Sequence, residues 1–422
     1  MKLNNKNIRN SLLKLMLLAV GLVSGNVVFA QEPVQEYMKL AGENNPELKA
    51  TFNEYMAAME QVPQVGALPD PTLAFGIFLQ PVETRLGAQR FNTSVSQMFP
   101  WFGTLSAKKD VATQMAKAKY EAFEDVKLQL YRDVGTTYDE LYYLDKAIDI
   151  TRENLDILAS FKELARVNFE GGRTGFVSVL RVEMEEQELR DKLSLLEDKK
   201  LPLKAKFASL LNTDLPDSIA FPDTLQVKTV MYEKETLVDS VLVNSPRLKK
   251  LEHEVEAMAN QEEVAKKMGL PSFNLGVNYI NIAPRTDMDL PDNGKDALVF
   301  PQVGISIPLY SGKYKAMRRE ASLKKEAASL RKEDMTNSLK TTVESLYQQY
   351  RDAMRRVELN ANLSDISTRS RDLLQTQFTN GEMDFEEILR MERKVLNYRL
   401  EEARARVDLN NIVYSINYLM GK

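Results

Sequence analysis

The sequence contains no cysteine among its 422 residues. This absence excludes disulfide bonds, thiol catalysis, cysteine-based zinc sites and attachment of a lipid to an N-terminal cysteine. Histidine occurs only as His253, so a site of several histidines is excluded too. No Gly-rich phosphate loop follows an expected strand, and no Gly-x-Ser-x-Gly nucleophile motif is present. The sequence therefore predicts no enzyme activity, no metal site and no cofactor.

Neither sign of charge dominates the chain, which has 56 basic and 60 acidic residues and a net charge of −4. A broad positive field is therefore lacking, and a nucleic-acid partner is not expected. The only long apolar run, Leu15 to Val23, is shorter than the roughly 20 residues that a membrane-spanning helix needs. Lysines and an arginine precede it and Val28-Phe29-Ala30 follows, which predicts a signal peptide over residues 1–30. A retained anchor helix is the alternative, although the polar Gln31-Glu32 start fits it poorly.

The rest of the chain contains two copies of one sequence repeat. Asn45-Pro46-Glu47-Leu48 recurs 200 residues later as Ser245-Pro246-Arg247-Leu248, and Pro71 and Gly76 recur as Pro271 and Gly276. Further on, Phe169-x-x-Gly172 recurs as Phe378-x-x-Gly381 at a shift of 209 (378 − 169). Fixed-period similarity of this kind indicates a repeated structural unit. We therefore divide the mature chain into a first repeat, 31–222, and a second, 223–422.

Each repeat is expected to contribute one β-hairpin. Apolar side chains alternate with small or polar ones over about 72–80 and 90–99, and again over about 272–282 and 298–309. A period of two predicts strands with one apolar face. The loops inside the two hairpins differ in length, because an Asp-, Pro- and Gly-containing stretch from Ile282 to Ala297 replaces the shorter Gln80 to Gln89.

Long helical hairpins follow the strands, over about 104–211 and about 313–420. In the first, apolar or Thr residues recur with alternating spacings of four and three, at Leu130, Val134, Thr137, Leu141, Leu144, Ile148, Thr151, Leu155 and Leu158. The second repeats this seam at Ile388, Met391, Val395, Tyr398, Ala405, Leu409, Ile412, Ile416 and Leu419, with Glu402 as a polar exception. Such heptads predict antiparallel coiled-coil hairpins that reverse at glycine-containing turns.

Four strands cannot close a barrel by themselves. Strands of about 9 to 11 residues with one apolar face match transmembrane β-strands, and an open edge in lipid would leave backbone groups unpaired. Copies of the chain must therefore pool their hairpins. Two copies would give eight strands and three would give twelve. A conduit favours three, because side chains fill an eight-stranded barrel.

Several motifs together resemble one family, the TolC-type outer-membrane efflux factors. They are the Asn-x-Pro-like head of each repeat, Leu68-Pro69-Asp70-Pro71-Thr72-Leu73, Gln97-Met98-Phe99-Pro100-Trp101-Phe102-Gly103 and the two Phe-x-x-Gly turns. The strand-entry and strand-exit motifs further resemble the heavy-metal branch that works with resistance-nodulation-division pumps. The resemblance implies a mainly α-helical protein with transmembrane β-strands, which forms a homotrimer with a twelve-stranded β-barrel in outer-membrane lipid and an α-helical tunnel in the periplasm.

The function implied by the resemblance is a passive exit duct of a tripartite efflux system, for heavy metals or drugs. Its partners would be a periplasmic adaptor (membrane fusion) protein and an inner-membrane pump of the resistance-nodulation-division type. A type I secretion duct is an alternative. A periplasmic adaptor or a coiled-coil scaffold is an alternative of another class, which the alternation in all four strands disfavours.

By the same resemblance, the helix turns would form the periplasmic entrance and contact the adaptor. The residues at these positions are Gly171, Gly172, Thr174, Gly175, Phe176, Leu180, Gly381, Phe385 and Leu389. The alternative for these residues is helix reversal alone, with Phe and Leu as seam residues.

Charged residues crowd the second turn and could form a selectivity ring, as they do in channels. They are Glu382, Asp384, Glu386, Glu387 and Arg390. Asp384 could instead complement the helix dipole, and Arg390 stands where the family has a second acidic residue, which weakens the expected preference for cations.

Aromatic residues occur where strands give way to helices, namely Phe99, Trp101, Phe102 and Tyr310. Such residues suit the boundary between membrane and water. Core packing is the alternative.

Overall fold

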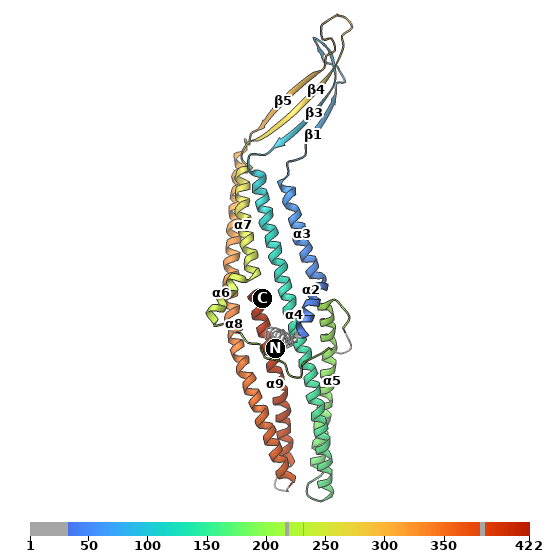
Figure 1. Ribbon diagram of the computed structural model, residues 1–422, viewed down its shortest axis with the longest axis vertical. Helices are drawn as coiled ribbons and strands as arrows, with labels where there is room; N and C mark the ends of the chain where they lie inside the picture. The colour runs from blue at the N-terminus through green and yellow to red at the C-terminus, as the bar shows by residue number, and fades with distance from the viewer. Residues whose placement is uncertain (1–32, 216–218, 231, 380–384) are drawn as a thin grey trace, which may run out of the picture.

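The computed structural model describes residues 33–215, 219–230, 232–379 and 385–422. The chain is elongated, with the strands at one end and helices along the rest of its length (Figure 1). The predicted signal peptide, residues 1–30, lies outside the described residues. In chain order the main elements are α2 (Pro33–Asn44), α3 (Pro46–Gly66), β1 (Thr72–Ile77), β2 (Glu83–Thr84), β3 (Gly87–Phe99), α4 (Thr104–Glu170), α5 (Val177–Leu211), α6 (Lys234–Asn244), α7 (Pro246–Lys267), β4 (Ser272–Ala283), β5 (Ala297–Ser306), α8 (Ser311–Thr379) and α9 (Phe385–Leu419).

The strands form a single antiparallel sheet in the order β1-β3-β4-β5, with the short β2 paired to β3. The two predicted hairpins are therefore β1/β3 and β4/β5, and the pairing of β3 with β4 joins the repeats. The strand bounds differ from the expected ones at several ends: β1 stops at Ile77, β3 begins at Gly87 and β5 stops at Ser306. Proline at position 308 restricts continuation of β5, since it has no N–H for the ladder.

Among the described residues, four helices precede the strands, two in each repeat, and the sequence analysis assigned none of them. In the first repeat the break between α2 and α3 lies at Asn45, whose side-chain oxygen accepts a hydrogen bond from the Leu48 N–H at 3.1 Å. Pro46 then occupies the first turn of α3, where its missing N–H has no helical partner to lose. Ser245 and Pro246 stand at the same junction between α6 and α7. The repeated head motif is thus a helix break.

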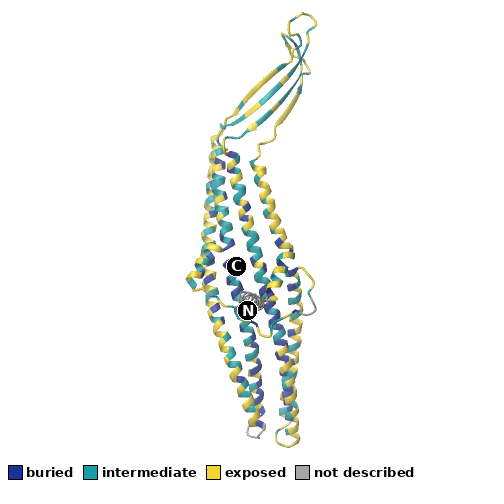
Figure 2. Cartoon of the chain, viewed as in Figure 1, coloured by how far each residue is buried: buried dark blue, intermediate teal, exposed yellow. Residues whose placement is uncertain are grey.

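Helices α4 and α8 run the length of the helical part, while α3 and α5 accompany successive stretches of α4, and α7 and α9 accompany successive stretches of α8 (Figure 1). The first predicted seam is confirmed, since every member except Leu155 is buried, and the buried residues follow the inner sides of the helices (Figure 2). The second seam is confirmed in part, because Met391, Tyr398 and Ile412 are only half-buried. Among the helices of the described residues, none has a stretch that is both long and apolar enough to cross a bilayer.

Candidate functional site

The two faces of the sheet differ in polarity. The register pairs Leu73 with Val95 and Val95 with Val277, so these three side chains share one face. The same face carries Phe75, Ile77, Phe91, Phe99, Phe273, Leu275, Tyr279, Val303 and Ile305, with Thr93, Gln97 and Asn281 as polar exceptions. The opposite face carries Thr72, Ala74, Gly76, Asn92, Ser94, Ser96, Asn274, Asn278, Gln302 and Gly304, with Met98, Ile280 and Val299 as apolar exceptions. One face of the sheet is thus mostly apolar and the other is mostly small or polar.

The aromatic residues predicted at the strand ends gather around Phe273. Trp101 stacks on the Phe273 ring at a centroid distance of 5.9 Å, and Phe102 lies 6.1 Å from the same ring. Phe99 pairs with Phe273 across the ladder from β3 to β4. Phe102 and Tyr310 are 78% and 81% exposed, respectively. Three of the four aromatics therefore form one cluster at the junction of sheet and helices.

The first helical turn, between α4 and α5, is described completely. The backbone N–H of Arg173 donates to the Asn168 carbonyl at 2.8 Å, and Gly172 adopts a left-handed φ of 68°. Phe176 packs on Phe169 at a ring distance of 5.2 Å but remains 51% exposed. Leu180, one turn further along α5, is 45% exposed. This tip therefore presents apolar side chains outward.

The second turn differs from the first. Gly381, Glu382 and Asp384 lie outside the described residues. Phe385 and Leu389 are only 1% and 3% exposed, because they pack in the core between the helical hairpins. In this arrangement their side chains are not available to a partner. The duplicated residues Phe176/Phe385 and Leu180/Leu389 thus have opposite environments at the two tips.

Two of the carboxylates near the second turn, Glu386 and Glu387, are paired with arginines. Glu386 forms an ion pair with Arg181 of α5 at 2.5 Å, which links the two repeats near their tips. Glu387 pairs with Arg390 one turn later on α9. Both pairs are solvent-exposed and contribute little to stability. They do partly neutralise the carboxylates that the sequence analysis assigned to a selectivity ring.

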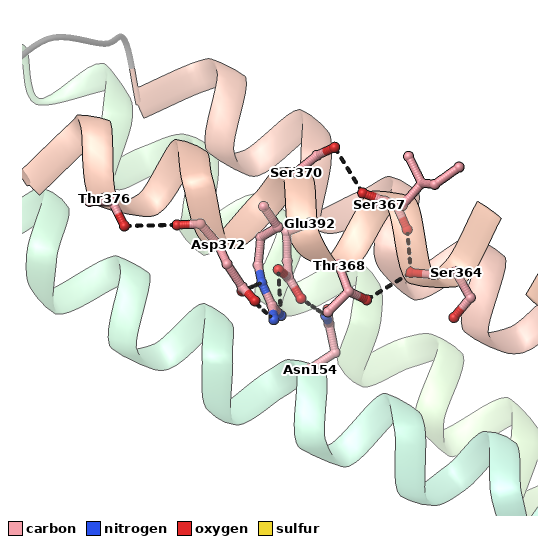
Figure 3. Close-up of polar contacts among 10 residues, drawn as sticks. Asn154, Ser364, Ser367, Thr368, Ser370, Asp372, Thr376 and Glu392 are labelled. Carbon is pink, nitrogen blue, oxygen red and sulfur yellow. Dashed lines mark hydrogen bonds and ion pairs between the residues drawn. The ribbon is translucent and has the colours of Figure 1, made fainter. Parts of the chain in front are cut away.

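Further from the tip, α9 carries a buried carboxylate that the sequence analysis missed. Glu392 is 1% exposed, and its carboxylate accepts a hydrogen bond from the Asn154 side-chain amide of α4 at 2.5 Å (Figure 3). The guanidinium of Arg371, on α8, lies 3.5 Å from the other carboxylate oxygen and also pairs with Asp372. Burial raises the pKa of Glu392, and the positive charge of Arg371 partly offsets this rise. One carboxylate thus links both helical hairpins.

A signal for Glu392 was present in the sequence. Ile388, Glu392 and Val395 follow the same spacing of four and three as the rest of the seam, which places the carboxylate on the buried face. The sequence analysis assigned Met391 to that position instead, because the residue is apolar. No group of metal-binding side chains occurs among the residues that the structure describes.

Comparison with known proteins agrees with this architecture. The family model for outer membrane efflux proteins matches residues 38–212 and 237–422. A curated relative, the toxin and drug export protein A of Aggregatibacter actinomycetemcomitans, is 27% identical over 179 residues, which are 42% of this chain and 38% of the relative. The chain thus matches well under half the length of that relative.

Solved structures share the fold. The outer-membrane channel OprN superposes with a TM-score of 0.76 at 16% identity, over 92% of this chain and 90% of that one. The outer membrane protein VceC of Vibrio cholerae gives the same TM-score at 16% identity, over 92% of this chain and 96% of that one.

Proposed function

The chain belongs to the outer membrane efflux protein family, and we propose that it is one subunit of a homotrimeric exit duct through the outer membrane. The observation that carries this proposal is the opposite polarity of the two sheet faces. An apolar face suits contact with lipid, and a small, polar face suits a water-filled lumen. Three copies would give a twelve-stranded barrel, with the helical hairpins forming a periplasmic α-barrel tunnel.

The edges of the sheet support assembly. Within the part of the chain that the structure describes, strands β1 and β5 each have a partner on one side only. Unpaired edges in hydrocarbon would leave backbone groups without hydrogen bonds. Pairing of β1 from one copy with β5 from the next would remove every edge once the ring closes. Eight strands from two copies would leave an interior filled by side chains, so a duct favours three copies.

Cysteine cross-linking tests the assembly, because the natural chain contains no cysteine. We would combine Ala74→Cys in β1 with Gln302→Cys, Gly304→Cys or Ser306→Cys in β5, all on the polar face. At least one pair should give cross-linked trimers on a non-reducing denaturing gel. As a matched control, Ala74→Cys with Ser94→Cys joins register partners within one chain, and should give only monomers.

The same experiments also have an outcome that would contradict the trimeric barrel. Recovery of the protein as a soluble periplasmic monomer, with no cross-link between β1 and β5 in any combination, would rule out the trimeric barrel. Two measurements test the assembly independently of cross-linking: migration as an intact trimer on an unboiled gel, and recovery in the membrane fraction. The aromatic cluster around Trp101, with Tyr310, would then lie at the periplasmic boundary of the membrane.

We further propose that a periplasmic adaptor docks at the tips and that an inner-membrane pump, of the resistance-nodulation-division type, delivers the substrates. The exposed Phe176 and Leu180 of the first tip support this more than the buried Phe385 and Leu389 do. Replacing Phe176 and Leu180 by Ser should reduce adaptor cross-linking and efflux together. Leu201→Ser is the control, since Leu201 is also exposed but lies towards the other end of α5.

The substrate class follows from complementation of a deletion strain challenged with copper, zinc, detergents and antibiotics. Sensitivity to metals alone would support the heavy-metal branch, and sensitivity to detergents and antibiotics would support drug efflux. The name of the toxin and drug export protein A supports a second candidate, a type I secretion duct. Loss of a secreted protein from the medium, with normal drug and metal tolerance, would favour that candidate.

A further inference from the structure

A crevice of about 240 Å³ opens where the sheet meets the helices. It lies between the end of β3, the start of α4, the end of α7 and the start of α8, at the upper end of the helical part in Figure 1. Its polar lining consists of Thr104, Lys108, Lys267, Ser272 and Ser306. Its other walls are formed by Met98, Pro100, Trp101, Met268, Leu270, Ile307, Pro308 and Tyr314. No carboxylate lines it within the described part of the chain.

The two lysines of this crevice, Lys108 and Lys267, form no ion pair among the described residues, and both are half-buried. Lys267 acts on the nearby Glu263 at longer range, but the ion pair of Glu263 is with Lys266. Lys267 lies close to the start of α4: a Cβ atom added to Gly103 would come within 3.1 Å of its Nζ. Gly103 also has a left-handed φ of 76°. Both this φ and the close approach of Lys267 favour glycine at the position. Two half-buried ammonium groups thus converge on one helix start.

The third component is a buried hydroxyl. Thr104 is the first residue of α4 and is 4% exposed, yet its Oγ1 has no hydrogen-bond partner within the described structure. A buried hydroxyl normally finds a partner, because leaving it unpaired costs free energy. No side chain caps this helix, since the preceding residue is Gly103. The positive end of the helix dipole and an unsatisfied hydroxyl therefore occur together with the two ammonium groups.

We propose that this crevice binds the phosphate group of an amphiphile. A phosphate offers several anionic oxygens, which match two ammonium groups, the Thr104 hydroxyl and a helix N-terminus better than a single carboxylate does. The apolar wall, with Trp101, Leu270 and Ile307, suits the hydrocarbon part of the same molecule. The amphiphile would be either a phospholipid of the surrounding bilayer or a solute within the duct. The two sources of the ligand rest on the proposed function, whereas binding of octyl phosphate in detergent tests the site independently of it.

Trp101 provides a specific reporter, because it lines the crevice and is the only tryptophan in the chain. The full-length protein in a non-ionic detergent would be titrated with octyl phosphate and, separately, with inorganic phosphate, while Trp101 fluorescence is recorded. We expect a saturable change with octyl phosphate and at least ten-fold weaker binding of inorganic phosphate. Equal affinity for the two would overturn the proposal, since the apolar wall would then contribute nothing.

A second arm identifies the source of the ligand. The protein in nanodiscs would contain brominated phosphatidylglycerol or, at the same density, a brominated glycolipid, which has no phosphate. Stronger quenching of Trp101 by the anionic lipid would identify a membrane phospholipid. Equal quenching by both lipids, with saturable octyl phosphate binding in detergent, would identify a solute in the duct. No saturable response in either arm would refute the site.

Variants separate binding from structure. Lys108→Gln and Lys267→Gln should each weaken octyl phosphate binding about five-fold, whereas Lys109→Gln, at an exposed neighbouring position, should leave it unchanged. Thr104→Val keeps the side-chain shape and should weaken binding about ten-fold. If Thr104→Val instead raises the melting temperature and leaves binding unchanged, the hydroxyl has no ligand. That result, or an equal effect of Lys109→Gln, would overturn the proposal.

Discussion

Replacing Glu392 by Gln is expected to stabilise α9 at neutral and alkaline pH. Burial raises the pKa of Glu392, so this carboxyl contributes most below its ordinary pKa, where it is neutral in both folded and unfolded states. That contribution is lost as the pH rises through the raised value, because the charge must then be held inside the protein. Each unit of rise in pKa corresponds to about 1.4 kcal/mol. Gln removes this penalty, and Arg371 retains Asp372 as a partner.

The hydrogen bond from the Asn154 amide to Glu392 also predicts how replacing Asn154 changes stability. Asn154→Ala removes the hydrogen bond to a charged oxygen, which costs about 2 kcal/mol at pH 8 and about 1 kcal/mol at pH 5, where more of the carboxyl is protonated. Hydrogen exchange measured by mass spectrometry on peptides of α9 provides the assay, because it reports local opening. We expect about thirty-fold faster exchange for Asn154→Ala at pH 8, after correction for intrinsic rates. The control is Asn397→Ala, which removes an amide from an exposed position on α9.

Two results would refute this reasoning. Faster exchange of the Glu392→Gln variant than of the natural protein at pH 8 would mean that the ionised carboxylate stabilises the helices, contrary to the expected penalty. An effect of Asn154→Ala that does not change between pH 5 and pH 8 would mean that its hydrogen bond is insensitive to the charge of Glu392.

Three further changes test other parts of the chain. Gly135→Ala should destabilise the helices by about 1 to 3 kcal/mol in thermal unfolding followed by circular dichroism, because its Cβ would lie 2.6 Å from the Tyr414 ring; adding Tyr414→Leu should recover the loss. Arg390→Ala should raise the cation preference of single channels in planar bilayers, because Glu387 loses its paired charge, and an unchanged reversal potential would place this pair outside the conducting path. Gly172→Ala should destabilise the first tip by about 1 kcal/mol, seen as faster hydrogen exchange of the turn only, because its left-handed φ of 68° disfavours a side chain.

The strands and long hairpins could be predicted because their signals are local. A period of two over β1 and β4, or a heptad seam along α4, is written in neighbouring residues. The helices before the strands were missed for a local reason too. In α3 the apolar residues Phe52 and Met56 remain more than 40% exposed, so no clear buried stripe marks the helix.

The contacts between the two helical hairpins could not be predicted from local patterns. Asn154 and Glu392 are 238 residues apart in the sequence, and Arg181 and Glu386 are 205 apart. A polar residue on a heptad seam indicates burial but not the partner that satisfies it. That partner is set by the way in which α9 packs against α4, a tertiary choice that the seam of either helix leaves open.

Duplication of the sequence did not produce duplicated surroundings. Helix α9 packs against both α4 and α8, whereas α5 packs mainly against α4. Phe385 is therefore covered by Phe161 of α4 and by Phe378, while the ring of its counterpart Phe176 packs on Phe169 of its own hairpin. Phe385 and Leu389 are covered within the chain, whereas Phe176 and Leu180 of the first tip keep an apolar surface that a partner can bury. In a trimer of this chain, docking through apolar contacts would consequently use three equivalent tips, one from each first repeat, and not all six.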